Sequence, residues 1–237
     1  MGQVPAVVVL PVIFVILGYT VNYLPSDDSD VVISTFLAKG AIAFGLGFMG
    51  MMAGYVLSAD VSSDATAWWI HLATGVRGWQ DRLGRVLAQS VWMAPLIVIV
   101  GVAVMWVMGM PARIPGALAA MVTLYLSGLG VSSVFSALII YPVALPGESP
   151  LKMKTGMMGS QMLSQFGCML VAGLLGLPIC VWAIFASGPV TWLILVIGVV
   201  WGMGLLVAGI VLGGKVMDSR GPAILQTLKK NDSRERA

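Results

Sequence analysis

Long apolar runs separated by short polar stretches dominate this chain. Each of six runs approaches the roughly 20 residues that a helix needs to cross about 30 Å of hydrocarbon. The runs cover Val4–Leu24, Ile33–Ala59, Val86–Met110, Ile114–Leu145, Ser160–Ala186 and Val190–Gly214. This pattern predicts an all-α membrane protein with six transmembrane helices. We expect one transmembrane domain over residues 1–214, which includes the connection at 60–85, and a polar, basic tail over residues 215–237.

The longest polar interruption lies between the second and third runs, over Asp60–Arg85. It opens with possible helix caps and continues with apolar residues at steps of three or four. The caps are Ser62, Ser63 and Asp64, and the apolar positions are Trp68, Leu72, Val76 and Trp79. This spacing predicts an amphipathic helix lying flat on the bilayer, with tryptophans in the headgroup layer. The helix either follows the membrane surface without further purpose or docks a cytoplasmic partner.

Charge placement predicts the orientation. With 59% hydrophobic and 10% charged residues, the chain lies far outside the range of soluble domains. Of its 13 basic residues, all but Lys39 and Arg113 fall in the second connection, the fourth connection or the tail. The positive-inside rule therefore predicts cytoplasmic termini in a multi-pass protein of the plasma membrane. Lys39 is explained best if the second span proper begins near Gly40 and Lys39 snorkels towards the acidic residues at 27–30; a substrate contact is the less favoured alternative.

Small residues form a second pattern inside the spans. Glycine occurs 29 times, and Gly50 and Gly54 have the spacing that lets two helix backbones approach closely. We expect such packing at Gly47, Gly50, Gly54, Gly128 and Ser132. A polar lining for a translocation path is the alternative.

Several chemistries have no support in the sequence. A phosphate-binding loop of the Gly-x-x-x-x-Gly-Lys-Ser/Thr type does not occur, so we expect no ATP hydrolysis by this chain and no enzymatic activity. The single histidine, His71, and the cysteines Cys168 and Cys180 offer no constellation for zinc or haem, so neither a metal site nor a bound cofactor is expected. No carboxylate lies in the middle of a span, which argues against a proton- or sodium-driven carrier. No nucleic-acid partner is expected.

Three stretches carry a resemblance to a known family. The run over 64–85 resembles the loop between the second and third spans of actinobacterial ABC-2 type exporter permeases. The Pro/Gly-rich segment Tyr141–Pro150, followed by Lys152, Lys154 and Gly156, is similar to the loop after the fourth span in that family. The segment Met217–Leu225 is a third stretch similar to that family, after the last span. The three similar stretches occupy the same positions relative to the predicted spans as in the family.

The resemblance implies a six-span permease that works with a second permease half or as a homodimer, surrounded by lipid. It also implies cytoplasmic ATPase subunits, which would bind ATP and Mg²⁺. A coupling helix in the loop between the second and third spans would contact the ATPase, through Trp68, Trp69, Arg77, Trp79, Asp81, Arg82 and Arg85. Family units usually begin with an amphipathic helix, and only Met1–Gln3 precede the first run here, so we expect either the C-terminal half of a twelve-span permease or a shortened reading frame. The alternative function is that of a stand-alone secondary transporter or a structural or assembly protein of the membrane.

Overall fold

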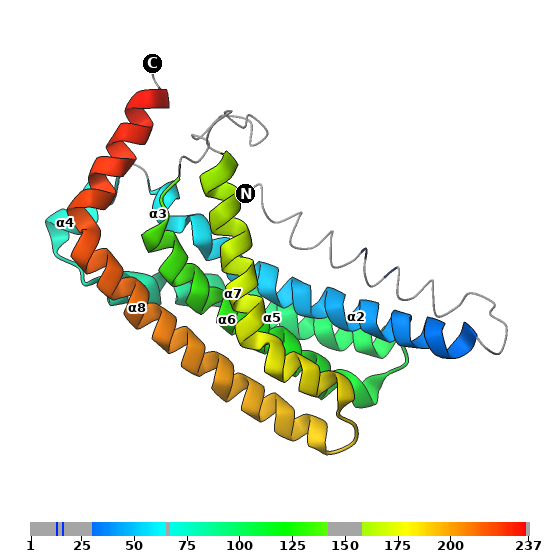
Figure 1. Cartoon of the computed structure of the whole chain (residues 1–237). Helices are drawn as coiled ribbons and strands as arrows, with labels where there is room; N and C mark the ends of the chain where they lie inside the picture. Colours follow the sequence, from blue (N-terminus) through cyan, green and yellow to red (C-terminus); the bar gives the residue numbers. More distant parts are fainter. Residues whose placement is uncertain (1–12, 14–15, 17–29, 65–66, 142–157, 236–237) are drawn as a thin grey trace.

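The computed structural model describes residues 13, 16, 30–64, 67–141 and 158–235. Every regular element within these residues is helical (Figure 1). The elements are α2 (Asp30–Tyr55), η1 (Val56–Ala59), α3 (Asp60–Ser63), α4 (Trp68–Thr74), α5 (Gly78–Val107), η3 (Pro111–Arg113), α6 (Ile114–Leu138), α7 (Met158–Phe185) and α8 (Val190–Glu235). The predicted first span at Val4–Leu24 and most of the Pro/Gly-rich loop after the fourth span lie outside the described residues.

Five helical stretches are long and apolar enough to cross a membrane: Ile42–Ser63, Gly78–Val107, Pro111–Leu138, Gln161–Phe185 and Val190–Lys229. They correspond to the second to sixth predicted spans. The described residues therefore confirm an all-α protein with several helices that are long and apolar enough to cross a membrane. The helix α2 runs without interruption from Asp30 through Lys39, so the segment before Gly40 and the span after it form a single helix.

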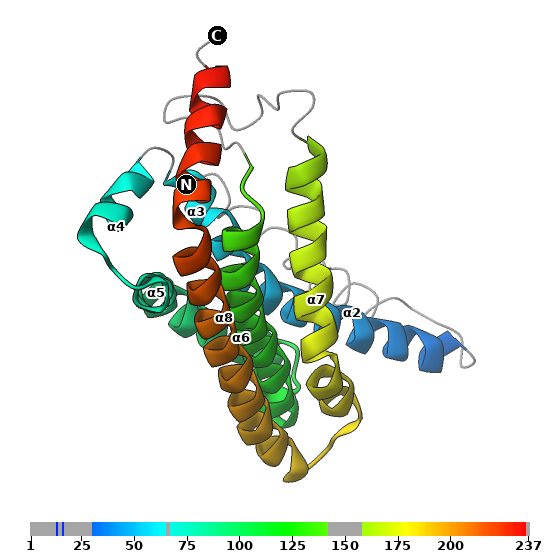
Figure 2. The ribbon, with the colours of Figure 1, turned by 60° about the vertical axis from the view of Figure 1, so that its left-hand side comes forward.

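The helix α6 forms the centre of the bundle. It contacts α2, α5, α7 and α8, and its residues are buried along most of its length (Figure 2). The surrounding helices α5, α7 and α8 instead expose broad apolar faces, for example at Trp92, which is 79% exposed. Because the solvent of a spanning helix is hydrocarbon, these outward apolar side chains are expected on lipid-facing surfaces.

Small residues allow α2 and α6 to approach closely. A Cβ atom at Gly50 or Gly54 would overlap backbone atoms of α6, and a Cβ at Gly128 would lie 3.1 Å from the Cα of Gly54. The Ser132 hydroxyl donates a hydrogen bond to the Gly54 carbonyl at 3.1 Å, and Gly47 faces the Leu124 side chain. All five positions that the sequence singled out for helix packing thus lie on this contact.

The helix α8 is much longer than its predicted span. Its 46 residues extend over about 69 Å, roughly twice the hydrocarbon thickness. Figure 1 shows it rising past the neighbouring helices towards the C-terminus. The tail was expected to form a separate region from residue 215, but in the structure it continues the same helix. Met217, Ile224 and Leu228 on this extension form a small core with Val61, Trp68 and Ala137.

One end of the bundle gathers nearly all the described basic side chains. It consists of η1, α3, α4, the first turns of α5, the last turns of α6 and residues 215–229 of α8, and we call it the basic end. Its basic residues are Arg77, Arg82, Arg85, Lys215, Arg220 and Lys229. Arg113 lies at the opposite end, in the turn between α5 and α6.

Candidate functional site

The connection over 60–85 is built from short helical pieces and the start of a spanning helix. The helix α4 ends at Thr74 because Gly75 adopts the left-handed conformation, with φ of 64°. Arg77 is then extended, and α5 starts at Gly78, about two turns before the predicted start of the third span. The prediction of one continuous amphipathic helix is therefore wrong.

The apolar residues that were predicted to share one face of that helix separate. Trp68 is 2% exposed, whereas Leu72, Val76 and Trp79 are between 41% and 46% exposed. The helix is interrupted between Thr74 and Gly78, where Gly75 is left-handed and Arg77 is extended, so a four-residue spacing across this break no longer places side chains on one face. Leu72, Val76 and Trp79 remain available at the surface of the basic end.

Trp68 anchors α4 on the extension of α8. Its indole N–H donates a hydrogen bond to the Gly221 carbonyl at 3.2 Å, and its ring is buried in the small core of the extension. A buried tryptophan needs such a partner for its N–H. Gly221 also lies close to α4, because a Cβ there would lie 2.8 Å from Leu72 Cδ2 and the Leu72 side chain would have to move. The position of α4 therefore depends on α8.

The first turn of α5 is held against α8 by two glycines. A Cβ atom at Gly214 would lie 2.5 Å from the Trp79 nitrogen, so only glycine permits this approach. The Gly78 N–H donates a hydrogen bond to Asp218 Oδ1 at 2.7 Å. The first N–H groups of a helix have no partner within the helix, and a carboxylate is favourable near its positive end. Asp218 of α8 thus serves as the cap of α5.

A network of charged side chains joins the remaining pieces of the basic end. Asp81 on α5 accepts hydrogen bonds from Arg82 Nη2 at 3.0 Å and from Arg85 Nε at 3.0 Å. Arg85 also forms a bidentate pair with Asp64 and lies 3.6 Å from Asp60. The residues Asp60 and Asp64 belong to α3 and its end, so this network fixes α3 to α5.

Two further contacts extend the network to α4 and α6. His71 Nδ1 of α4 lies 3.6 Å from Asp81 Oδ1. The Arg82 side chain is completely buried, and its Nη1 donates a hydrogen bond to Ser136 Oγ of α6 at 2.7 Å. A buried guanidinium needs a carboxylate close by, because an unpaired buried charge is strongly destabilising. Four segments of the basic end are therefore joined through one cluster of charges.

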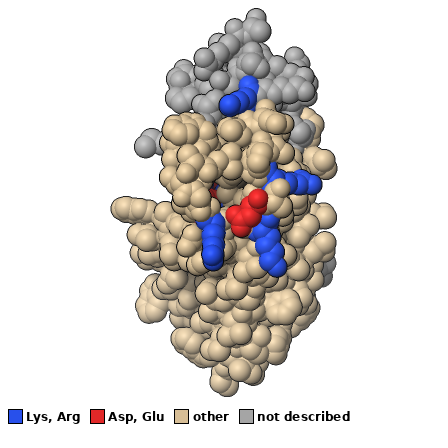
Figure 3. Space-filling model, turned by 90° about the vertical axis from the view of Figure 1, so that its left-hand side faces the viewer, with Lys and Arg blue, Asp and Glu red and all other residues tan. Residues whose placement is uncertain are grey.

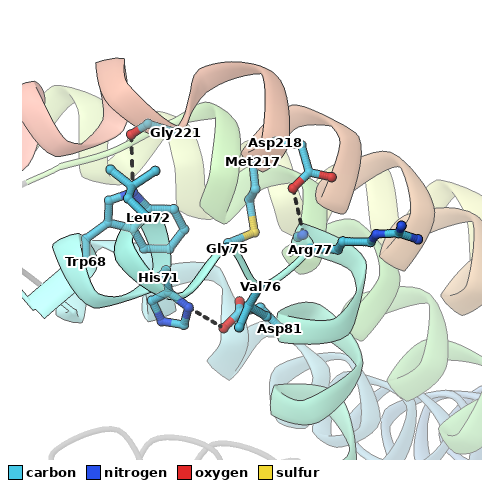
Figure 4. A pocket seen from close by; sticks show the side chains of 11 residues that line it. Trp68, His71, Leu72, Gly75, Val76, Arg77, Asp81, Met217, Asp218 and Gly221 are labelled. Carbon is cyan, nitrogen blue, oxygen red and sulfur yellow. Dashed lines mark hydrogen bonds and ion pairs between the residues drawn. The ribbon is translucent and has the colours of Figure 1, made fainter.

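Between α4, the start of α5 and α8 lies a crevice of about 240 Å³. Its apolar wall consists of Trp68, Leu72, Val76 and Met217, and Asp81 and Asp218 provide carboxylates. Figure 4 shows Trp68 directed towards Gly221 and His71 towards Asp81. Trp68, His71, Asp81 and Asp218 thus already have polar partners within the chain.

The residues that the resemblance assigned to ATPase contacts divide into two groups. Trp69, Arg77 and Trp79 are exposed. Trp68 and Arg82 are buried, and Asp81 and Arg85 are largely occupied by the charge network. The second group therefore acts within the chain.

Sequence reasoning missed the contacts of several residues of the basic end. It named Asp64 only as a possible helix cap, and it gave no contact to Asp60, Ser136, Gly214, Asp218 or Gly221. Their partners are distant in the sequence, so no local pattern indicates them. A readable signal did exist on α8, because Met217, Ile224 and Leu228 recur at helical spacing beyond the apolar run.

Comparison with protein-family models, with curated proteins and with solved structures gives no match for this chain. The function is therefore argued from the geometry of the basic end and from the sequence.

Proposed function

We propose that this chain is the transmembrane permease subunit of an ABC exporter in the plasma membrane, driven by ATPase subunits that dock at its basic end. In this proposal the basic end faces the cytoplasm, as the distribution of basic residues favours. ATP and Mg²⁺ are bound by the partner ATPase, and the permease works with a second permease unit.

The observation that carries the proposal is the way an exposed element is tied to the spanning helices. The exposed side chains Trp69 and Trp79 lie on α4 and in the first turn of α5. The helix α4 is fixed to α8 by Trp68, and α5 is fixed to α8 by Asp218 and to α3 by Arg85. A displacement imposed on α4 would therefore act on α5 and α8 together. Such a connection suits a subunit whose spanning helices are moved by a partner.

The exposed tryptophans also suit a protein contact. Tryptophan is among the residues that contribute most to binding at the centre of protein interfaces. Lipid contact is the competing explanation for an exposed tryptophan in this chain. The two explanations are separable, because α5 offers Trp92 and Trp106, which are 79% and 70% exposed along the spanning segment, as matched residues.

The test compares two double variants in membranes that contain the chain and candidate ATPase subunits. We expect Trp69→Ala with Trp79→Ala to reduce the amount of ATPase that purifies with the chain by tenfold or more. Trp92→Ala with Trp106→Ala should leave that amount unchanged. Purification of the wild-type chain without any ATPase would contradict the proposal and favour a stand-alone membrane protein.

A third variant tests transmission apart from docking. Arg85→Gln removes the link between α3 and α5 and leaves the exposed tryptophans in place. We expect the ATPase to remain bound, while ATP no longer changes the rate at which a cysteine at the exposed Ser187 reacts with a thiol reagent. A wild-type response to ATP in this variant would show that the charge network does not transmit movement.

A further inference from the structure

We infer that the crevice at the basic end is a docking site for a protein. It receives one apolar side chain from an acidic surface of a partner, and the extension of α8 forms half of this docking site. The inference rests on the proposed function only for the identity of the partner, which is the ATPase subunit. It goes beyond a coupling helix on the 60–85 connection, because it assigns binding to Met217 and to the basic residues of α8.

The size and chemistry of the crevice select its occupant. Its volume of about 240 Å³ lies below the range of about 300–1,000 Å³ that is typical of small-molecule pockets. Trp68, Leu72, Val76 and Met217 provide an apolar wall, and methionine adapts its shape to what it contacts. The Trp68 and Gly78 N–H groups already donate to acceptors within the chain. A single apolar side chain therefore fits this crevice better than a polar ligand.

The surroundings of the crevice select the charge of the partner. Exposed basic residues lie on the same elements, at Arg77 in the link before α5 and at Lys215, Arg220 and Lys229 on α8. Asp218 is the acidic residue among positions 215–229. On this face of the molecule, basic side chains flank an acidic one at the edge of a hollow (Figure 3). Complementary charge guides association and selects between partners, so an acidic surface is expected opposite.

An anionic membrane surface is the competing occupant, and the length of the α8 extension disfavours it. The helix α8 leaves its apolar run near Gly214, and Lys229 lies about 22 Å further along the helix at 1.5 Å per residue. Headgroups extend only about 6 Å beyond the hydrocarbon on each side, and charges are screened over about 8 Å. A protein can contact this whole extension, whereas lipid cannot.

The first experiment identifies what occupies the crevice. A photoreactive phenylalanine derivative replaces Leu72 on the crevice wall, or Val200 on the exposed face of the α8 span as a control. Both chains are irradiated in membranes and the adducts are identified by mass spectrometry. We expect the probe at residue 72 to react with an acidic segment of the ATPase subunit and the probe at residue 200 to react with lipid.

The second experiment tests the two features of the surface separately. Arg77→Glu with Arg220→Glu should lower the amount of co-purifying ATPase at least tenfold, whereas Arg113→Glu at the opposite end should not. Reversing the charge of the cross-linked acidic segment should restore binding to the charge-reversed chain. Val76→Trp, which fills the crevice from an exposed position, should weaken binding, and an unchanged melting temperature in detergent shows that the chain still folds.

The outcomes distinguish this inference from the proposed function. If the ATPase co-purifies but the probe at residue 72 reacts with lipid alone and charge reversal has no effect, the inference is wrong and the proposed function stands. If no ATPase co-purifies but the probe reacts with an acidic segment of another protein and charge reversal on both sides restores binding, the docking site stands and the proposed function is wrong. Adducts with lipid alone, without a co-purifying ATPase, overturn both.

Discussion

The guanidinium of Arg82 donates a hydrogen bond from Nη1 to Ser136 Oγ at 2.7 Å and joins α5 to α6 inside the basic end. Arg82 is completely buried, and Asp81 is the carboxylate that pairs with it at 3.0 Å. This arrangement places a full positive charge among spanning helices, where an unpaired charge is costly. The stability of the basic end therefore depends on Asp81 more than on the exposed charges around it.

The first prediction tests that dependence. Asp81→Asn removes the carboxylate partner of Arg82, while Arg85 keeps Asp60 and Asp64. We expect a loss of about 3–5 kcal/mol in the free energy of unfolding, the usual cost of leaving a buried charge unpaired. Unfolding in detergent, followed by circular dichroism, measures the loss.

A compensating change sharpens this test. Adding Arg82→Met to Asp81→Asn removes the buried charge as well, and apolar replacements of buried ion pairs are often neutral or stabilising. We expect the double variant to regain most of the lost stability. Arg77→Gln, at an exposed position, should change stability by less than about 0.5 kcal/mol and serves as the control. Equal stability of Asp81→Asn and the wild type would show that Arg82 does not depend on this partner.

The second prediction concerns the contact between α2 and α6. Gly54→Leu should force these helices apart, because even a Cβ at this position would lie 2.8 Å from the Leu129 nitrogen. We expect a large fall in the melting temperature and in the yield of folded protein. Gly204→Leu on α8 is the matched control, since no atom lies within 4 Å of a Cβ at that position. Similar behaviour of the two variants would argue against close packing at Gly54.

The third prediction separates two neighbouring tryptophans. Trp68→Ala removes a buried side chain and its hydrogen bond to Gly221, and should cost about 3–5 kcal/mol, as is usual for such truncations. Trp68→Phe retains most of the packing and should cost about 0.5–1.5 kcal/mol. Trp69→Ala, at a position that is 56% exposed, should be close to neutral for stability. Hydrogen exchange of α4 reports the effect locally, and equal protection in all variants would contradict the anchoring role of Trp68.

The fourth prediction concerns orientation. If the basic end is cytoplasmic, a cysteine introduced at the exposed Ser187, between α7 and α8, should react with a membrane-impermeant thiol reagent in intact cells. A cysteine at the exposed Ser219 on the α8 extension should react after the cells are opened. Reaction of the Ser219 variant in intact cells would reverse the orientation.

The sequence by itself determined the spans that the structure describes. Crossing a bilayer requires a sufficiently long apolar run, which is a local property, so the second to sixth predicted spans reappear as helices. The spacing of Gly50 and Gly54 is likewise local, and these residues face α6. The clustering of basic residues on alternate connections is a property of the sequence alone, and it remains a prediction of orientation.

Only the tertiary structure decided how the basic end is assembled. The amphipathic helix predicted to carry Trp68, Leu72, Val76 and Trp79 is broken at Gly75, and Trp68 on α4 packs on α8. Arg82 is hydrogen-bonded to Ser136 and Arg85 to Asp64, and these partners lie far from them in the chain. Contacts between such distant residues are determined by how the helices pack against one another, so no pattern within one segment can indicate them. For the same reason, the sequence predicted only a polar, basic tail from residue 215, and the tertiary structure packs Met217, Ile224 and Leu228 of that tail with Val61 and Trp68.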